Sequence, residues 1–232
     1  MPVTGFLPPT WAPASGLAGT ATDLLAFCLL HTGAHTRAGA VLDAEHRALM
    51  HTPAADADAF GMADGWGLGL AGYGDPDGPW LGHDGTVDGA SCAVRFSPRT
   101  GTAVAMTANA STGTRLWSDV LRELRAFGIH VADYAATIPA AIPPAAAGAV
   151  LGDYANGTTV FSVRPHEDGV RLSDRTGLLA DLEMHEHHYF SARRVDAATA
   201  PFVGRFVASR GTRDITVMQL AGRSARRVAA AG

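Results

Sequence analysis

Hydrophobic positions recur at a helical period in three segments of the first half of the chain. They predict helices over Asp23–Leu30, Val41–Met50 and Thr114–Phe127. Thr20 or Thr22 is placed to cap the first helix, because a hydroxyl there can accept a hydrogen bond from the first turn. The strand-like part of this half therefore lies between helices.

Between the helices the hydrophobic pattern changes to that of strands. Gly65–Gly72 and Trp80–His83 are expected strands, separated by the turn signal Asp75–Pro79. A hairpin follows, in which Ala90–Phe96 and Ala103–Thr107 flank a loop that ends in glycine. The pattern predicts an antiparallel sheet with flanking helices.

The composition changes near residue 134. Residues 134–148 are rich in Ala and Pro, and we expect a semi-rigid linker there between a first domain (1–133) and a second (149–232). Short segments separated by turn residues then predict an antiparallel β barrel or sandwich. The expected strands are Gly152–Asn156, Thr158–Val163, Gly169–Leu172, Leu179–Met184, His188–Ala192, Phe202–Ala208 and Asp214–Leu220. The chain is thus expected to be an α+β protein.

Composition and charge exclude several function classes. A hydrophobic fraction of 47% with 17% charged residues is typical of a folded protein, and a formal charge of −4 argues against a nucleic-acid partner. The basic segment Arg223–Arg227 is interpreted as a solvated tail. No apolar run approaches the roughly 20 residues that span a bilayer, and Met1 opens no signal-peptide pattern. We therefore expect no membrane partner and a cytoplasmic chain, although a preceding segment could carry a signal.

The cysteines and the absence of lysine limit the available nucleophiles. Cys28 and Cys92 lie in apolar stretches and are expected to be reduced core thiols. All 18 basic residues are arginine. The chain therefore cannot contain a Ser-x-x-Lys nucleophile.

His83 is the most informative candidate residue. Gly82–Thr86 lies between a glycine-punctuated strand and a hairpin, which places a histidine and backbone N–H groups at a strand edge. That setting suits serine acyl transfer. The simpler interpretation is a histidine in a turn beside an Asp-Gly reversal.

Four segments in fixed order resemble class C β-lactamase-like serine hydrolases, the group of S12 peptidases and penicillin-binding esterases. These segments are Gly16–Leu24, Gly65–Gly69, Gly82–Gly89 and Val104–Asn109. The region that opens with Leu151–Tyr154 resembles the lipocalin-like domain that follows some members. The resemblance implies the C-terminal part of a β-lactamase-like fold, followed by a small antiparallel β barrel.

By this resemblance, Gly82–Gly89 holds the third catalytic motif. His83 would supply polarity or positive charge beside the nucleophile, and Gly85 would keep the strand bare for substrate. The backbone N–H of Thr86 would be one of two oxyanion donors. The family's Ser-x-x-Lys and Tyr-x-Asn motifs both precede this one. Tyr154–Asn156 has the letters of the Tyr-x-Asn motif but lies after the third motif instead of before it. A strand that ends in an Asn-Gly turn explains this segment better.

A metal site is the other chemistry that the sequence suggests. On a strand, His185 and His187 would share a face and could chelate Zn²⁺ or Ni²⁺. No third ligand is evident, and the polar face of an exposed barrel strand accounts for both. Asp75 and Asp77 lack the glycine and distal glutamate of a Ca²⁺ loop. We therefore expect neither a metal nor another cofactor.

Two functions of different class follow. The chain is either the C-terminal part of a serine hydrolase or acyltransferase that acts on D-amino-acid peptides, esters or β-lactams, or a non-catalytic binding or assembly module. In the first case it is inactive alone, its partners are a small-molecule or peptide substrate, and an N-terminal complementing segment or self-association completes it. In the second, the barrel mouth could take an apolar ligand.

Overall fold

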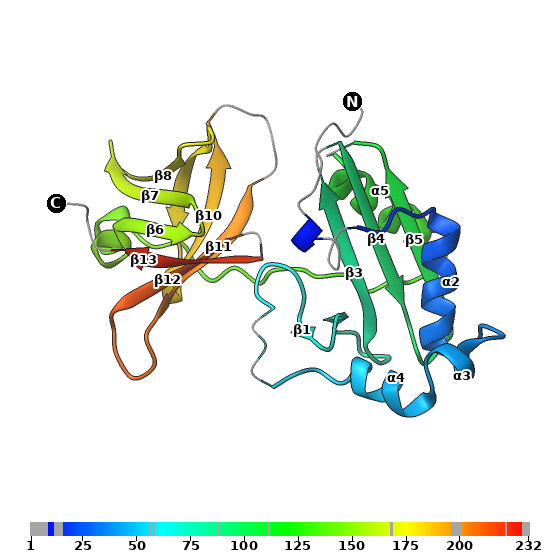
Figure 1. The fold of residues 1–232 in the computed structure, drawn as a ribbon. Coiled ribbons are helices and arrows are strands. Elements are labelled where there is room, and N and C mark those ends of the chain that lie inside the picture. Colours follow the sequence, from blue (N-terminus) through cyan, green and yellow to red (C-terminus); the bar gives the residue numbers. More distant parts are fainter. Residues whose placement is uncertain are drawn as a thin grey trace. The chain divides into compact units, whose positions relative to one another are not determined.

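The structure, a computed structural model, describes residues 9–11, 16–55, 57, 59–87, 89–110, 112–167, 169–195, 201–220 and 222–228. They divide into two compact units, one within Met1–Ala59 and Ala63–Tyr134 and the other within Phe60–Met62 and Ala135–Gly232. The first contains an antiparallel sheet with helices and the second a closed barrel (Figure 1). The expected α+β class is confirmed.

Five antiparallel strands form the sheet of the first unit, in the order β1-β2-β3-β4-β5. Their bounds are β1 (Gly65–Trp66), β2 (Ala71–Tyr73), β3 (Trp80–Val87), β4 (Ala90–Phe96) and β5 (Ala103–Ala108). The expectation of one strand over Gly65–Gly72 is wrong, because the chain reverses between β1 and β2 through Gly69, which has a φ of 79°. The strand expected over Trp80–His83 continues to Val87.

The helices of this unit are α2 (Ala21–Thr32), α3 (Ala38–Val41), α4 (Ala44–His51) and α5 (Gly113–Ala126), and the short 3-10 helix η1 spans Pro9–Trp11. Thr20 caps α2, since its hydroxyl accepts from the Asp23 N–H and the Asp23 carboxylate accepts from the Thr20 N–H. The prediction of a single helix over Val41–Met50 is wrong. The chain breaks at Leu42 and starts again after Asp43, whose carboxylate accepts from the His46 N–H.

The two long helices, α2 and α5, both pack on strands β4 and β5 (Figure 1). The hydrophobic residues of this unit form two clusters, one on each face of the sheet. We call these faces the α2 side and the α5 side. The α2 side consists of Leu24, Cys28, Met50, Leu70, Leu81, Val94, Phe96, Ala103 and Ala105. The α5 side consists of Ala59, Ala63, Trp66, Ala71, Tyr73, Trp80, Val104, Leu121, Leu124, Val131, Ala132 and Tyr134. Because strand residues alternate between faces, neighbours such as Leu81 and Trp80 face opposite sides.

Eight strands form the closed barrel of the second unit, in the order β10-β11-β12-β13-β6-β7-β8-β9. Their bounds are β6 (Gly152–Asn156), β7 (Thr159–His166), β8 (Gly169–Asp174), β9 (Leu179–Met184), β10 (Tyr189–Arg194), β11 (Phe202–Ala208), β12 (Ile215–Leu220) and β13 (Arg223–Val228). The interpretation of Arg223–Arg227 as a solvated tail is wrong, because β13 pairs with β12 and β6 and closes the barrel. Arg227 donates to the carbonyls of Ala149, Leu151 and Ile215 at this closure.

Large side chains fill the barrel interior. Tyr154, Phe190 and Met218 are completely buried, and the Tyr154 hydroxyl donates to the Val150 carbonyl. Part of the Ala/Pro-rich segment belongs to this packing, since Ile142 lies against the core and its N–H donates to the Met184 carbonyl. The barrel is therefore built around a packed core. The 3-10 helices η2 (Pro144–Val150) and η3 (Glu186–His188) complete the unit.

A pair of histidines, one buried and one half-buried, joins α2 to α4. His31 is 3% exposed, and its Nδ1 lies 3.3 Å from Nε2 of His51. Burial, with smaller contributions from His51 and Arg47, lowers the pKa of His31 to about 4, and burial also lowers the pKa of His51. Both rings are thus neutral in the folded protein near pH 7.

Of the helices that the structure describes, none is both long and apolar enough to cross a bilayer.

We predict that Arg227→Ala lowers the free energy of unfolding of the barrel by about 1–2 kcal/mol, because several carbonyls lose a charged donor. Amide hydrogen exchange of β6 and β13 measures this change. Arg226→Ala, on the same strand and also exposed, should cost less than about 0.5 kcal/mol. Equal losses of unfolding free energy in the two variants would contradict a role for Arg227 in closing the barrel and would indicate a solvated tail.

We further predict that the first unit loses stability as the pH falls from about 6.5 to about 4. In that window the unfolded chain protonates a histidine that the folded chain keeps neutral, so the unfolded state binds more protons. Urea unfolding at a series of pH values, followed by tryptophan fluorescence, measures the slope. His31→Leu should flatten it, and an unchanged slope would contradict this origin.

Candidate active site

The candidate third motif lies on a half-free strand. β3 pairs with β4 from Leu81 to Val87, but with β2 only from Trp80 to Gly82. Within the described residues, no strand pairs with the outer edge of His83–Val87. The interpretation of His83 in a turn is therefore wrong, and the segment is an edge strand with main-chain groups available to an added strand.

Alternation along β3 sends the motif residues to opposite faces. His83 pairs with Val94 and Gly85 with Cys92, and Val94 belongs to the core on the α2 side. Asp84 pairs with Ala93 and faces the α5 side, where it bonds Arg95. Alternation therefore directs the Cβ of His83 toward the α2 side, while its ring lies at the open edge of the sheet, 5.4 Å from the ring of Trp66, which packs in the α5-side cluster.

His83 is exposed and partly held in place. Its Nδ1 lies 2.6 Å from the backbone carbonyl of Asp84, which can only accept, so Nδ1 carries the proton. The ring of Trp66 lies edge-on to it, with 5.4 Å between centroids. In the neutral ring Nε2 is therefore a proton acceptor.

Gly85 has a packing role that the sequence did not reveal. A Cβ at this position would lie 2.7 Å from Sγ of Cys92, so a larger residue would displace that side chain. Burial raises the pKa of Cys92 and raises that of Cys28 to about 11. Both cysteines are free thiols, as expected, and neither is an activated nucleophile.

Thr86 is exposed near the end of β3 and pairs with Ser91. Ser91 is buried, and its hydroxyl donates to the Ala110 carbonyl. A cavity of about 40 Å³ lies beside these residues, lined also by Met106 and Thr114. It is large enough for water but not for a substrate, so the candidate site is an open strand edge.

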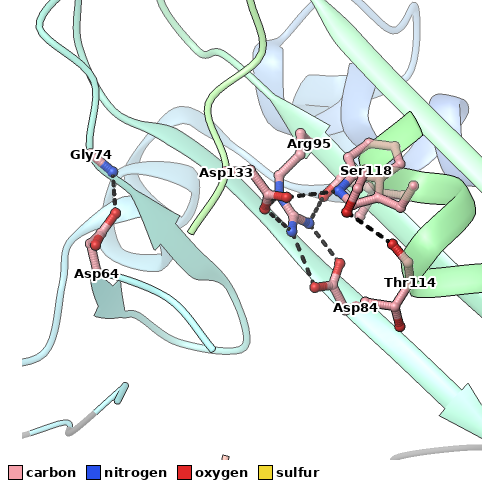
Figure 2. Close-up of polar contacts among 9 residues, drawn as sticks. Asp64, Gly74, Asp84, Arg95, Thr114, Ser118 and Asp133 are labelled. Carbon is pink, nitrogen blue, oxygen red and sulfur yellow. Dashed lines mark hydrogen bonds and ion pairs between the residues drawn. The ribbon is translucent and has the colours of Figure 1, made fainter. Parts of the chain in front are cut away.

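A buried arginine, not identified from the sequence, lies behind the motif. The side chain of Arg95 is 1% exposed, and its guanidinium donates to both oxygens of Asp84 at 2.7 and 3.1 Å. Figure 2 shows it between this carboxylate and that of Asp133, which is 2.6 Å from Nη2. The guanidinium also lies over the Tyr73 ring at 3.8 Å, and Trp117 donates to Asp133. One charged group thus ties β3 and β4 to the segment after α5.

A larger hollow of about 470 Å³ contains none of the motif residues. It is lined by Asp75, Asp77, Gly78, Trp80, Ser97, Arg99, Thr100, Thr102, Gly128, Ile129 and His130. The two aspartates lie in a turn, as expected, because the Asp75 carboxylate accepts a hydrogen bond from the Asp77 N–H. The same carboxylate lies 2.5 Å from Nε2 of His130.

The histidine cluster does not form a chelating pair. His185 and His187 do not share a strand face, because His185 follows β9 and His187 lies in η3 with a φ of 58°. His185 is buried and bonds the Ser191 hydroxyl, whereas His187 is exposed. Among the residues that the structure describes, no three His, Cys, Asp or Glu side chains lie close enough to hold a metal ion. Tyr154 and Asn156 lie in β6, as expected.

Comparison with known proteins identifies relatives of both parts of the chain. The family model described as Beta-lactamase matches residues 1–126. Penicillin-binding protein 4 of Amycolatopsis lactamdurans is 36% identical over 129 residues, which cover 53% of this chain and 33% of that protein. A crystal structure of SurE with D-Leu superposes with a TM-score of 0.78 at 35% identity, covering 90% of this chain and 50% of that one. A second SurE structure gives 0.75 at 34% identity. The chain thus spans a third to a half of the length of these relatives.

We predict that Asp84→Ala destabilises the first unit by about 2–3 kcal/mol, because the buried Arg95 loses one of its two carboxylates. Urea unfolding followed by tryptophan fluorescence measures the loss. Asp119→Ala is a matched control: the two aspartates are 45% and 44% exposed, but the arginine partner of Asp119 is 67% exposed. The control should cost less than about 0.5 kcal/mol, and equal losses would show that burial of Arg95 is not what matters.

Proposed function

Because the chain belongs to the β-lactamase family, we propose that it is the C-terminal part of a serine hydrolase or acyltransferase. The observation that carries this proposal is the placement of His83 on an open strand edge, with Trp66 and the Asp84 carbonyl holding its ring. The chain has no lysine to activate a serine. The nucleophile would come from a segment outside this chain.

The residues of β3 would then form one wall of the active site. Substrate would add as a strand along His83–Val87, where Gly85 offers no side chain. His83 Nε2 would accept a proton or, when protonated, bind a substrate carboxylate. As the serine oxygen adds to the substrate carbonyl, the Thr86 N–H would bind the developing oxyanion, and the leaving amine or alcohol would take the serine proton.

A D-amino-acid peptide is the substrate class that we favour over esters and β-lactams, because SurE, which superposes on most of this chain, was crystallised with D-Leu. Hydrolysis and acyl transfer to a second nucleophile are both consistent with an open edge. The packed barrel core gives no support to the alternative in which the chain binds an apolar ligand there.

We expect this chain alone to remain unlabelled by a fluorophosphonate probe. Mixed with the part of SurE that lies outside the superposed region, it should allow labelling of one serine, which the second chain carries. Gel fluorescence and mass spectrometry of the labelled peptide measure both results. Stoichiometric labelling of this chain alone would contradict the proposal.

In the same mixture, His83→Ala should lower kcat/KM for a D-Leu peptide ester by about 10²-fold, the usual contribution of a positioned acid or base. The melting temperature should not change, since the side chain is exposed. His46→Ala removes another exposed histidine and should leave kcat/KM unchanged. A large loss of stability in His83→Ala would instead indicate a structural histidine.

A further inference from the structure

The hollow of about 470 Å³ lies at the Trp80 end of β3, where three connections of the first unit meet. They are the turn between β2 and β3, the hairpin loop between β4 and β5, and the segment that follows α5. These connections bring Asp77, Arg99 and His130 to one place, and none of the motif residues of β3 lines the hollow. A cavity of this volume is within the range that holds a small organic ligand.

A buried carboxylate orients the histidine of the hollow. The side chain of Asp75 is 5% exposed, and its Oδ2 lies 2.5 Å from Nε2 of His130, whose own side chain is 54% exposed. The Asp77 N–H, with smaller contributions from His130 and Arg99, lowers the pKa of Asp75, so this carboxylate is ionised near pH 7. An ionised carboxylate can only accept, so Nε2 carries the proton. In the neutral ring Nδ1 is then an acceptor, and it has no partner among the described residues.

Arg99 is a cation that no carboxylate holds closely. Its guanidinium lies 3.9 Å from Asp77, and the two side chains are 59% and 83% exposed. An ion pair this loose and exposed contributes little to stability. The stem of Arg99 lies against Gly78, where a Cβ would come within 3.5 Å of it and where the φ of 112° disfavours a larger residue. The turn thus presents a positive and a negative group beside each other, each with hydrogen-bonding capacity left for a ligand.

The other walls of the hollow are apolar or fixed in place. Trp80, which is buried, and Ile129, which is 42% exposed, both line it. The hairpin loop is held by its own hydrogen bonds, since the Ser97 hydroxyl accepts from the Thr100 N–H and the Thr100 hydroxyl donates to that of Thr102. A loop that is already ordered loses little entropy when a ligand binds.

The charges of the lining residues distinguish between ligand classes. With a neutral histidine, the carboxylates of Asp75 and Asp77 outnumber the guanidinium of Arg99, so the hollow repels a simple anion such as phosphate. A bare cation would leave the guanidinium without a partner. An α-amino acid carries a carboxylate and an ammonium on one carbon, and so can engage a guanidinium and a carboxylate that lie next to each other.

We propose that the hollow binds a free α-amino acid with an apolar side chain. The ligand carboxylate binds the Arg99 guanidinium, and the ammonium lies between the Asp77 carboxylate and Nδ1 of His130. The apolar side chain packs against Trp80 and Ile129. Binding here does not require the proposed acyl transfer, because none of the motif residues of β3 lines the hollow.

Calorimetric titration of the full 232-residue chain with leucine tests this site. N-acetylleucine lacks the ammonium and leucinamide lacks the carboxylate, so each should bind at least about tenfold more weakly than leucine. Arg99→Gln should weaken leucine binding by a similar factor, because the ligand carboxylate loses a charged donor. Arg122→Gln is the matched control, since it removes another exposed arginine and should bind leucine as the unaltered chain does. Circular dichroism and melting temperature confirm that each variant is folded.

Amide chemical shifts of Gly78, Thr100 and Ile129 should move on addition of leucine and so locate the ligand in the hollow. Absence of binding by the unaltered chain, equal binding of either analogue, or equal effects of the two arginine substitutions would overturn the proposal. Binding that His83→Ala abolishes and Arg99→Gln leaves unchanged would place the amino acid at the edge of β3. That result would refute the hollow as its site and leave the proposed function standing.

Discussion

The ion pair between Arg95 and Asp84 fixes the direction in which the edge strand β3 faces. A slip of one residue would exchange the two faces of the strand and move His83 to the α5 side. Such a slip would separate the Asp84 carboxylate from a guanidinium that is 1% exposed, and removing one partner of a buried charge is strongly unfavourable. Asp133 and the Tyr73 ring hold the same guanidinium from the other side. The position of the candidate catalytic histidine therefore depends on a charge buried behind it.

This constraint also decides which groups of β3 face each side of the sheet. With the register fixed, the backbone directs His83 and Gly85 toward the α2 side and Asp84 toward the α5 side. Apolar side chains are exposed on both sides, at Phe27 of α2 and at Leu116 of α5. The unpaired edge of β3 lies between the two faces, and under the proposed function a nucleophile from another segment would meet substrate there.

Local patterns in the sequence predicted the parts of the fold that depend on local physics. The amphipathic period located α5, the two candidate caps Thr20 and Thr22 located the start of α2 to within two residues, and alternation located β4 and β5. Arg95 could not be predicted, because its partners lie 11 and 38 residues away and only the folded sheet brings them together. Its one signal is a charged residue at an inward position of an apolar strand. Strand β13 was missed because only Ala225 faces the core, which leaves a polar segment that resembles a tail.

Hydrogen–deuterium exchange measured with and without the nucleophile-bearing partner tests the central claim most directly. The account predicts that the partner slows exchange in His83–Val87 of β3, while the barrel strands exchange as before. Unchanged exchange in His83–Val87 would contradict the claim that a nucleophile-bearing partner completes the site at the open edge of β3.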